Sequence, residues 1–202
     1  MELSPTFHHV ALWRLGGSPA GSSSLNAPPA DGDIRYQPYF CEENIWQLAA
    51  DPAPGGGERA VLVVSGTGGT VACWEQRAGP DDGPILWDYH VVLLAGGPAW
   101  TIWDLDCRRG CPLPAAVWLA ASFPFPDRIR LRHQPRFAWF SAAEWRNRFS
   151  SDRAHMRDGA GGWLQPPPPW PAIQAGDLTL DLAIAAARQG CDLRGLAVRL
   201  RV

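Results

Sequence analysis

Two strand-like segments joined by a short turn constrain the fold of this chain more than any other feature. Residues 85–94 and 100–105 are rich in β-branched and aromatic side chains, and a Gly-Gly-Pro sequence at 96–98 separates them. This pattern predicts a hairpin of two antiparallel strands. The first strand carries His90 and the second carries Asp104. Adjacent strands bring such a pair close enough for the carboxylate to hold one tautomer of the imidazole.

The alternation of side chains predicts that the strand at 85–94 lies in the interior of the sheet. Both of its faces are mainly apolar, as expected for a strand that helices cover on both sides. One face would hold Ile85, Trp87, Tyr89, Val91 and Leu93, and the other Leu86, Asp88, His90, Val92 and Leu94. A histidine in such a strand is more often a hydrogen-bonded core residue than a catalytic base, so His90 alone indicates little.

Short strands and separate helices fill the rest of the chain. Helices are predicted at 41–50, 113–122, 141–148 and 180–188, and strands at 60–65, 70–75, 129–131, 137–140 and 196–202. Ser141 and Glu144 form the capping pattern that opens the third of these helices. Antiparallel strands with segregated helices indicate an α+β fold, with a largely antiparallel central sheet flanked by helices.

The first part of the sequence differs in composition from the rest. Residues 16–33 are rich in Gly, Ser, Pro and Ala and show no periodicity, which is typical of a flexible linker. We therefore predict an N-terminal extension at 1–35 and one folded domain at 36–202. A chain of 202 residues can bury a core of useful size within a single domain.

Charge and composition exclude several functional classes. A net charge of −2 gives no reason to expect a nucleic acid or an anionic membrane as partner. All 18 basic residues are Arg, which excludes a Schiff-base or P-loop lysine. No segment approaches the ~18 apolar residues of a membrane span, and the N-terminus has no signal-peptide pattern. We expect a monomer in the cytoplasm, or also in the nucleus if the source is eukaryotic.

Cys41 begins the predicted helix at 41–50. Free N–H groups and the dipole at a helix start favour a thiolate, so we expect the pKa of Cys41 to lie below the ordinary ~8.5. The simpler interpretation is a buried structural thiol, the commoner fate of a cysteine. The chain has five cysteines, an odd number without disulfide-framework spacing, so we expect reduced thiols. Cys107 and Cys111 lack a second Cys/His pair at zinc spacing, and we expect no metal there.

A helix-borne cysteine followed by a histidine and an aspartate on neighbouring strands is the order of the triad in papain-like and transglutaminase-like thiol enzymes. Cys41, His90 and Asp104 follow that order, which predicts a catalytic core of this kind. Asp106 is the alternative aspartate, because it shares a face with Asp104 in a continuous strand. We favour Asp104 because apolar residues flank it, whereas Asp106 borders a Cys-Arg-Arg-Gly sequence at 107–110.

Five blocks of sequence surround these residues in a fixed order. They are Tyr39-Phe40-Cys41-Glu42-Glu43-Asn44-Ile45-Trp46-Gln47-Leu48, then Asp82-Gly83-Pro84-Ile85-Leu86-Trp87-Asp88-Tyr89-His90-Val91-Val92-Leu93-Leu94, then Asp104-Leu105-Asp106, then Ser151-Asp152-Arg153-Ala154-His155-Met156, and last the proline run 166–169 with Trp170-Pro171 and Gly176-Asp177 beyond it. Together they resemble the protein N-terminal glutamine amidohydrolase family. The second block is long and unusual, which makes the resemblance specific.

The resemblance implies that the domain at 36–202 hydrolyses the N-terminal glutamine of proteins or peptides to glutamate and releases ammonia. It also implies that Cys41, His90 and Asp104 form the triad, that a glutamyl thioester is the intermediate, and that no cofactor or metal takes part. In the family, the product enters arginylation and N-degron turnover. The alternatives are a transglutaminase-like or protease-like thiol enzyme and a catalytically silent binding module.

Selectivity for an N-terminus requires a group that binds the α-ammonium, and a carboxylate near Cys41 is the physical expectation. The candidates for this role are Glu42, Glu43, Asp88 and Asp152, and Trp87, Ser151 and His155 complete the set of candidate substrate-binding residues. Glu42 and Glu43 also have a simpler explanation. Acidic side chains in the first turn of a helix interact favourably with its dipole.

Overall fold

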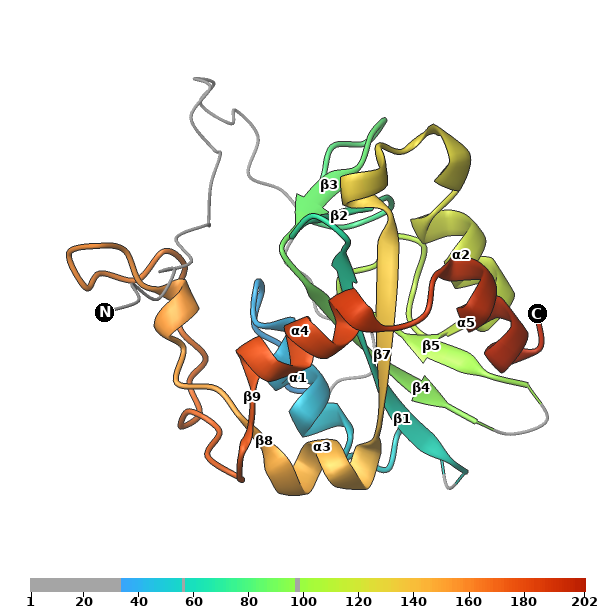
Figure 1. The fold of residues 1–202 in the computed structure, drawn as a ribbon. Helices are drawn as coiled ribbons and strands as arrows, with labels where there is room; N and C mark the ends of the chain where they lie inside the picture. Colours follow the sequence, from blue (N-terminus) through green and yellow to red (C-terminus); the bar gives the residue numbers. More distant parts are fainter. Residues whose placement is uncertain (1–33, 56, 97–98) are drawn as a thin grey trace.

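The computed structural model describes residues 34–55, 57–96 and 99–202, so the predicted linker lies outside the described residues. A five-stranded antiparallel sheet in the order β6-β5-β4-β1-β7 forms the centre (Figure 1). Its strands are β1 (Arg59–Gly66), β4 (His90–Ala95), β5 (Thr101–Trp103), β6 (Leu113–Pro114) and β7 (Pro135–Ser141). The predicted strands at 60–65 and 137–140 are therefore confirmed.

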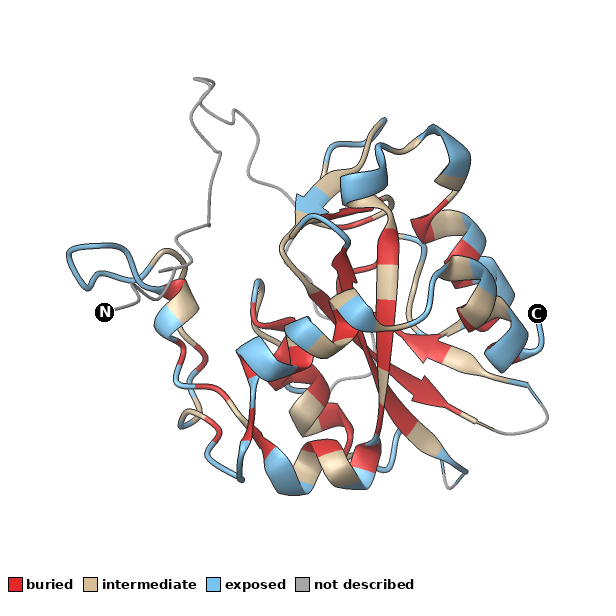
Figure 2. Ribbon diagram, viewed as in Figure 1, coloured by how far each residue is buried: buried red, intermediate tan, exposed pale blue. Residues whose placement is uncertain are grey.

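Helices cover both faces of this sheet. On one face lie α1 (Cys41–Leu48), α3 (Ala142–Arg148) and α4 (Leu180–Gln189), and on the other α2 (Ala115–Ser122) and α5 (Leu193–Leu200). Side chains of β1 alternate between the two cores: Val61 and Val63 face the first, Leu62 and Val64 the second. Figure 2 shows buried residues along the sheet and exposed ones on the outer sides of the helices. The predicted α+β fold is confirmed.

Two small strand pairs lie outside the main sheet. β2 (Val71–Cys73) pairs antiparallel with β3 (Ile85–Trp87), and β8 (Phe149–Ser150) pairs parallel with β9 (Leu178–Thr179). Short 3-10 helices occur at Pro126–Arg128, Leu131–His133 and Ala154–Met156. Within the part of the chain that the structure describes, no helix has the length and apolar character needed to cross a bilayer.

The predicted single strand at 85–94 is wrong, because the chain passes from one sheet to another within it. Residues up to Trp87 form β3, and β4 begins at His90. At the break, the hydroxyl of Ser65 in β1 donates to the backbone carbonyl of Asp88 at 2.8 Å. This carbonyl therefore bonds to a side chain rather than to a neighbouring strand. The two continuous faces predicted across 85–94 do not exist.

Two other predicted strands, 129–131 and 196–202, are also wrong. The first leads into a 3-10 helix, and most of the second lies in α5. Asp192 caps α5 by accepting the Gly195 N–H at 2.8 Å. Three leucines then recur at helical spacing on the side of α5 that faces the core. They are Leu193, Leu196 and Leu200.

The four predicted helices are confirmed, with small shifts at their ends. Ser141 caps α3 by accepting the Glu144 N–H at 3.0 Å, as the capping pattern predicts. α1 packs against β4, and β4 pairs with β5. The helix that begins at Cys41, the strand that begins at His90 and the strand that precedes Asp104 are thus neighbours. This is the arrangement expected of the predicted catalytic core.

Candidate active site

A buried histidine–aspartate pair lies where β4 begins and β5 ends. Nε2 of His90 is 2.9 Å from Oδ1 of Asp104, and both side chains are almost fully buried. Gln76 and Trp118 donate to Oδ2 of Asp104 at 3.0 and 2.9 Å. The backbone N–H of Asp106 donates to Oδ1 at 3.1 Å. These donors hold the carboxylate in one orientation.

Each member of this pair favours the charged form of the other. Burial acts to raise the pKa of Asp104, but the charge of His90 and the hydrogen bonds outweigh it and hold this pKa below its usual value. Burial acts to lower the pKa of His90, and Asp104 outweighs it and raises that pKa. The imidazole is therefore suited to hold a proton. Because Nε2 faces Asp104, Nδ1 is the nitrogen left for a reaction.

Asp106 lies close to the pair, but its carboxylate bonds to a different side chain. Its Oδ1 accepts the Tyr36 hydroxyl at 2.6 Å, and burial raises its pKa. The structure thus places Asp104, rather than Asp106, against His90. His90, Asp104 and Asp106 each offer one ligand atom within 4.8 Å of the others, a grouping that could hold a metal ion. Both oxygens of Asp104, however, already accept N–H groups, which would compete with a cation.

Cys41 is the first residue of α1, and its thiol lies at the start of β4. The backbone N–H of Val91, which follows His90 directly, donates to the sulfur. The predicted lowering of the Cys41 pKa is wrong. Burial raises this pKa well above its ordinary value, and the carboxylates of Glu42 and Asp106 add to the effect. The thiol therefore needs a proton acceptor before it can act as a nucleophile.

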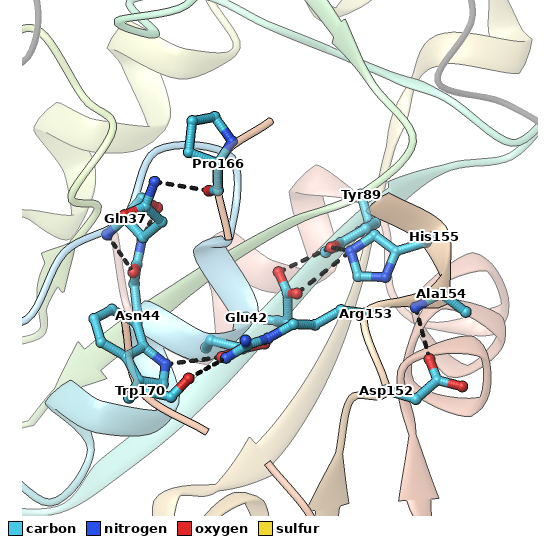
Figure 3. Close-up of polar contacts among 11 residues, drawn as sticks. Gln37, Glu42, Asn44, Tyr89, Asp152, Arg153, Ala154, His155, Pro166 and Trp170 are labelled. Atoms are coloured by element: carbon cyan, nitrogen blue, oxygen red, sulfur yellow. Dashed lines mark hydrogen bonds and ion pairs between the residues drawn. The ribbon is translucent and has the colours of Figure 1, made fainter. Parts of the chain in front are cut away.

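Glu42 follows Cys41 in α1 and is fully buried. Its Oε2 is 3.8 Å from the Cys41 sulfur and accepts the Tyr89 hydroxyl at 2.8 Å. Nε2 of His155 is 3.1 Å from the Tyr89 oxygen and 3.4 Å from Oε1 of Glu42. Figure 3 shows Tyr89 and His155 side by side at this carboxylate. Oε1 has no hydrogen bond from any described residue.

Glu43, the next residue, is equally buried but fully partnered. Nε and Nη2 of Arg153 donate to its two oxygens at 2.6 and 2.7 Å. The indole N–H of Trp170 donates to Oε2 at 2.8 Å, and the Trp170 carbonyl accepts from Arg153 at 2.8 Å. Figure 3 shows Arg153 and Trp170 in contact here. Glu43 therefore joins α1 to the segment that carries His155.

Replacing Glu43 by glutamine is expected to lower the free energy of unfolding by about 3–5 kcal/mol, because the buried Arg153 charge loses its partner. Chemical denaturation monitored by tryptophan fluorescence measures this. The matched control is Glu144→Gln, which removes an exposed i,i+4 ion pair with Arg148 and should cost less than about 1 kcal/mol. A loss for Glu43→Gln no larger than that of the control would show that the pair does not stabilise the fold.

The other candidate residues differ in what they contact. Trp87 stacks on the His90 ring, with centroids 6.3 Å apart and planes at 14°, and so forms one wall beside the imidazole. Ser151 is buried, and among the described residues its hydroxyl has no hydrogen-bond partner. Asp152 is exposed and accepts a backbone N–H at 2.8 Å. Asp88 is half-buried at the break between β3 and β4.

Several residues that hold the site together were not selected from the sequence. They are Gln76, Tyr89, Trp118, Arg153 and Trp170. Tyr89 directly precedes His90, and Arg153 and Trp170 lie in the blocks that carry the family resemblance, so the sequence contained a signal for these three. Gln76 and Trp118 are far from Asp104 in the sequence, and nothing in the residues around them indicates that they donate to its carboxylate.

Comparison with known proteins relates the chain to one family. The model of the N-terminal glutamine amidase family matches residues 36–193. Proteins named protein N-terminal glutamine amidohydrolase from Bos taurus and Homo sapiens are each 37% identical over 164 residues, 77% of this chain and 78% of the relative. The protein of that name from Danio rerio is 28% identical over 164 residues, 76% and 79% of the two chains. The NMR structure of protein-glutaminase from Chryseobacterium proteolyticum is 16% identical, covers 66% of this chain and 65% of its own, and has a TM-score of 0.37. This TM-score is too low to support a conclusion about the fold.

Proposed function

The chain belongs to the N-terminal glutamine amidase family of enzymes, and on this premise we propose that it hydrolyses the N-terminal glutamine of proteins and peptides to glutamate and ammonia. Cys41 is the proposed nucleophile, His90 the acid and base, and Asp104 the carboxylate that orients the imidazole. The observation that supports these roles is the buried contact of 2.9 Å between His90 and Asp104. The Cys41 thiol lies beside this pair, because the backbone N–H of Val91, the residue after His90, donates to its sulfur.

In the first half of the reaction, Nδ1 of His90 accepts the thiol proton while the Cys41 sulfur attacks the side-chain amide carbon. A C–S bond forms, and the carbonyl oxygen becomes an oxyanion. Backbone N–H groups at the start of α1, including that of Cys41, stabilise this charge. The imidazolium then gives its proton to the amide nitrogen, and the C–N bond breaks. Ammonia leaves, and a glutamyl thioester remains.

In the second half, His90 takes a proton from water as the water oxygen attacks the thioester carbon. The C–S bond breaks, and the sulfur of Cys41 recovers its proton from the imidazolium. Asp104 stabilises the imidazolium in both halves, and its lowered pKa keeps the carboxylate charged while it does so. Atoms and charge balance in these steps with water as the only second reactant.

An assay with three peptides tests this function. One peptide begins with glutamine, the second is the same peptide N-acetylated, and the third contains glutamine only inside the sequence. We expect ammonia release, and conversion of glutamine to glutamate by mass spectrometry, from the first peptide alone.

Each alternative predicts another result in the same assay. Equal ammonia release from all three peptides would contradict specificity for the N-terminus. Cleavage of the peptide chain would indicate a protease, and incorporation of an added amine would indicate a transglutaminase. No turnover of any peptide would favour a binding module without catalysis.

A further inference from the structure

Two neighbouring glutamates in α1 are both fully buried, yet only one of them has an arginine as its partner. Glu43 has the guanidinium of Arg153 on both oxygens. Oε2 of Glu42 accepts the Tyr89 hydroxyl at 2.8 Å and the Cys41 thiol at 3.8 Å. Among the described residues its Oε1 accepts no hydrogen bond and has only the partly exposed imidazole of His155 nearby, at 3.4 Å. A buried carboxylate without a full set of partners is costly. The protein therefore keeps an incompletely satisfied negative charge inside its site.

This charge lies next to the atom that reacts. Oε2 of Glu42 is 3.8 Å from the Cys41 sulfur. In a glutamine, four covalent bonds separate the α-nitrogen from the side-chain amide carbon. A glutamine whose amide carbon lies at the sulfur therefore has its α-ammonium within reach of the Glu42 carboxylate.

Tyr89 and His155 both contact the Glu42 carboxylate, and His155 lies on its solvent side. The Tyr89 hydroxyl contacts Oε2 and also His155, and Oε1, which accepts no hydrogen bond from a described residue, lies 3.4 Å from His155. The side chain of His155 is 27% exposed, which makes it the boundary between the buried carboxylate and solvent. Figure 3 shows the segment of Asp152, Arg153 and His155 beside Glu42. The Arg153–Glu43 ion pair ties this segment to α1.

We propose that the Glu42 carboxylate binds the α-ammonium group of the substrate's first residue, with Tyr89 and His155 as the residues that position it. This inference rests on the reaction proposed above and adds the group that selects a free N-terminus. An acetylated or internal glutamine brings no cation to Glu42. It would leave the buried carboxylate with only His155 near Oε1 in the complex, which disfavours binding.

The same contact links substrate recognition to the nucleophile. After burial, the Glu42 charge is the largest influence that raises the Cys41 pKa, followed by Asp106. An ammonium group that neutralises Glu42 lowers that pKa. The thiol therefore loses its proton to His90 more readily when a free N-terminus is bound than when the site is empty.

Two other acidic candidates fit this role less well. Both oxygens of Glu43 are used by Arg153, and Trp170 donates to one of them as well. Asp152 is exposed, so water rather than substrate satisfies its charge. Only Glu42 combines full burial, an oxygen without a hydrogen bond among the described residues, and contact with the Cys41 sulfur.

The test compares kcat/KM for a peptide that begins with glutamine and for its des-amino analogue, in which hydrogen replaces the α-ammonium. For the wild-type protein we expect a preference for the ammonium peptide of at least about 30-fold, the scale for removing one partner of a buried charge pair. In Glu42→Gln this ratio should fall to within about threefold of unity. In the control Asp152→Asn, which keeps an acceptor for the backbone N–H, the ratio should stay at the wild-type value.

A second arm leaves Glu42 untouched. In Cys41→Ala, calorimetry should show that the ammonium peptide binds at least about 30-fold more tightly than the des-amino analogue. Equal binding of the two would overturn the proposal, even if Glu42→Gln does not fold. Equal losses of kcat/KM for both peptides in Glu42→Gln, with the ratio retained, would also overturn it, because the carboxylate would then act on the amide or the thiol. Loss of the ratio in Asp152→Asn would assign the role to Asp152 instead.

The two proposals fail in different ways. A wild-type protein that releases no ammonia from the glutamine peptide would contradict the proposed reaction, while the binding comparison in Cys41→Ala would still test the ammonium site. A wild-type protein that releases ammonia equally well from the ammonium and des-amino peptides would leave the reaction in place and overturn the ammonium site.

Discussion

Replacing Cys41 by alanine is expected to lower kcat for ammonia release by about 10⁶-fold, the scale seen when the nucleophile of a catalytic triad is removed. The reason is that no neighbouring group can replace it. Of the other acids and bases near the sulfur, His90 and Asp104 serve proton transfer and orientation, and Glu42 is the proposed ligand of the α-ammonium. Without a sulfur, water must attack the amide directly, and the thioester that divides the reaction into two easier steps cannot form. Single-turnover ammonia release, measured at high enzyme concentration, reaches the required sensitivity.

The matched control is Cys191→Ala, which removes an exposed thiol at the N-terminal end of α5 and should leave kcat unchanged. Thermal unfolding of both variants shows whether the small cavity left at Cys41 disturbs the fold. A folded Cys41→Ala protein that keeps a hundredth of the wild-type kcat would contradict a cysteine nucleophile. A Cys191→Ala protein that loses activity to the same extent would contradict the choice of cysteine.

The sequence was sufficient for features that depend on neighbouring residues along the chain. The capping pair Ser141 and Glu144 predicted α3, and it forms as expected. The hairpin pattern placed His90 and Asp104 on neighbouring strands, and the structure brings them to 2.9 Å. Periodicity and turn chemistry act over a few residues, so a single sequence contains them.

Features that depend on distant residues could not be predicted in this way. The break between β3 and β4 at Asp88 involves Ser65, which lies 23 residues earlier in another strand. The partner of Glu43 is Arg153, 110 residues away. From the sequence, Glu43 was therefore indistinguishable from Glu42, although Glu43 has a buried arginine on both oxygens and Glu42 has only a partly exposed histidine at 3.4 Å.

The Cys41 pKa also depends on distant residues, so the sequence alone could not predict it. The helix start is a local feature and predicts a lower pKa. Burial against β4 and the nearby carboxylates of Glu42 and Asp106 act in the opposite direction and outweigh it. Desolvation and the charges of distant residues are set by the tertiary structure. The sequence correctly placed Cys41 at the start of a helix, but it predicted a lowered pKa where the structure raises it.

Replacing Asp104 by asparagine is expected to lower kcat by about 10⁴-fold with little change in the fold, as for the aspartate of serine-protease triads. Gln76 and Trp118 donate to Oδ2 of Asp104, and they would hold the asparagine carbonyl oxygen on their side. The amide NH₂ then faces Nε2 of His90, and this nitrogen must become the acceptor. Nδ1 consequently carries the proton and cannot take one from the Cys41 thiol. The pH dependence of kcat/KM measures the loss of the base.

Asp106→Asn is the matched control, because it removes a buried carboxylate two residues away that is bonded to Tyr36 rather than to His90. An asparagine there can still accept the Tyr36 hydroxyl through its carbonyl oxygen. The kcat of Asp106→Asn should fall by less than about tenfold, since the tautomer of His90 does not depend on the Asp106 carboxylate. It also removes one of the charges that raise the Cys41 pKa, which favours the thiolate. If Asp106→Asn were the inactive variant and Asp104→Asn the active one, the aspartate that serves His90 would be Asp106, and the 2.9 Å contact between His90 and Asp104 would have to change during catalysis.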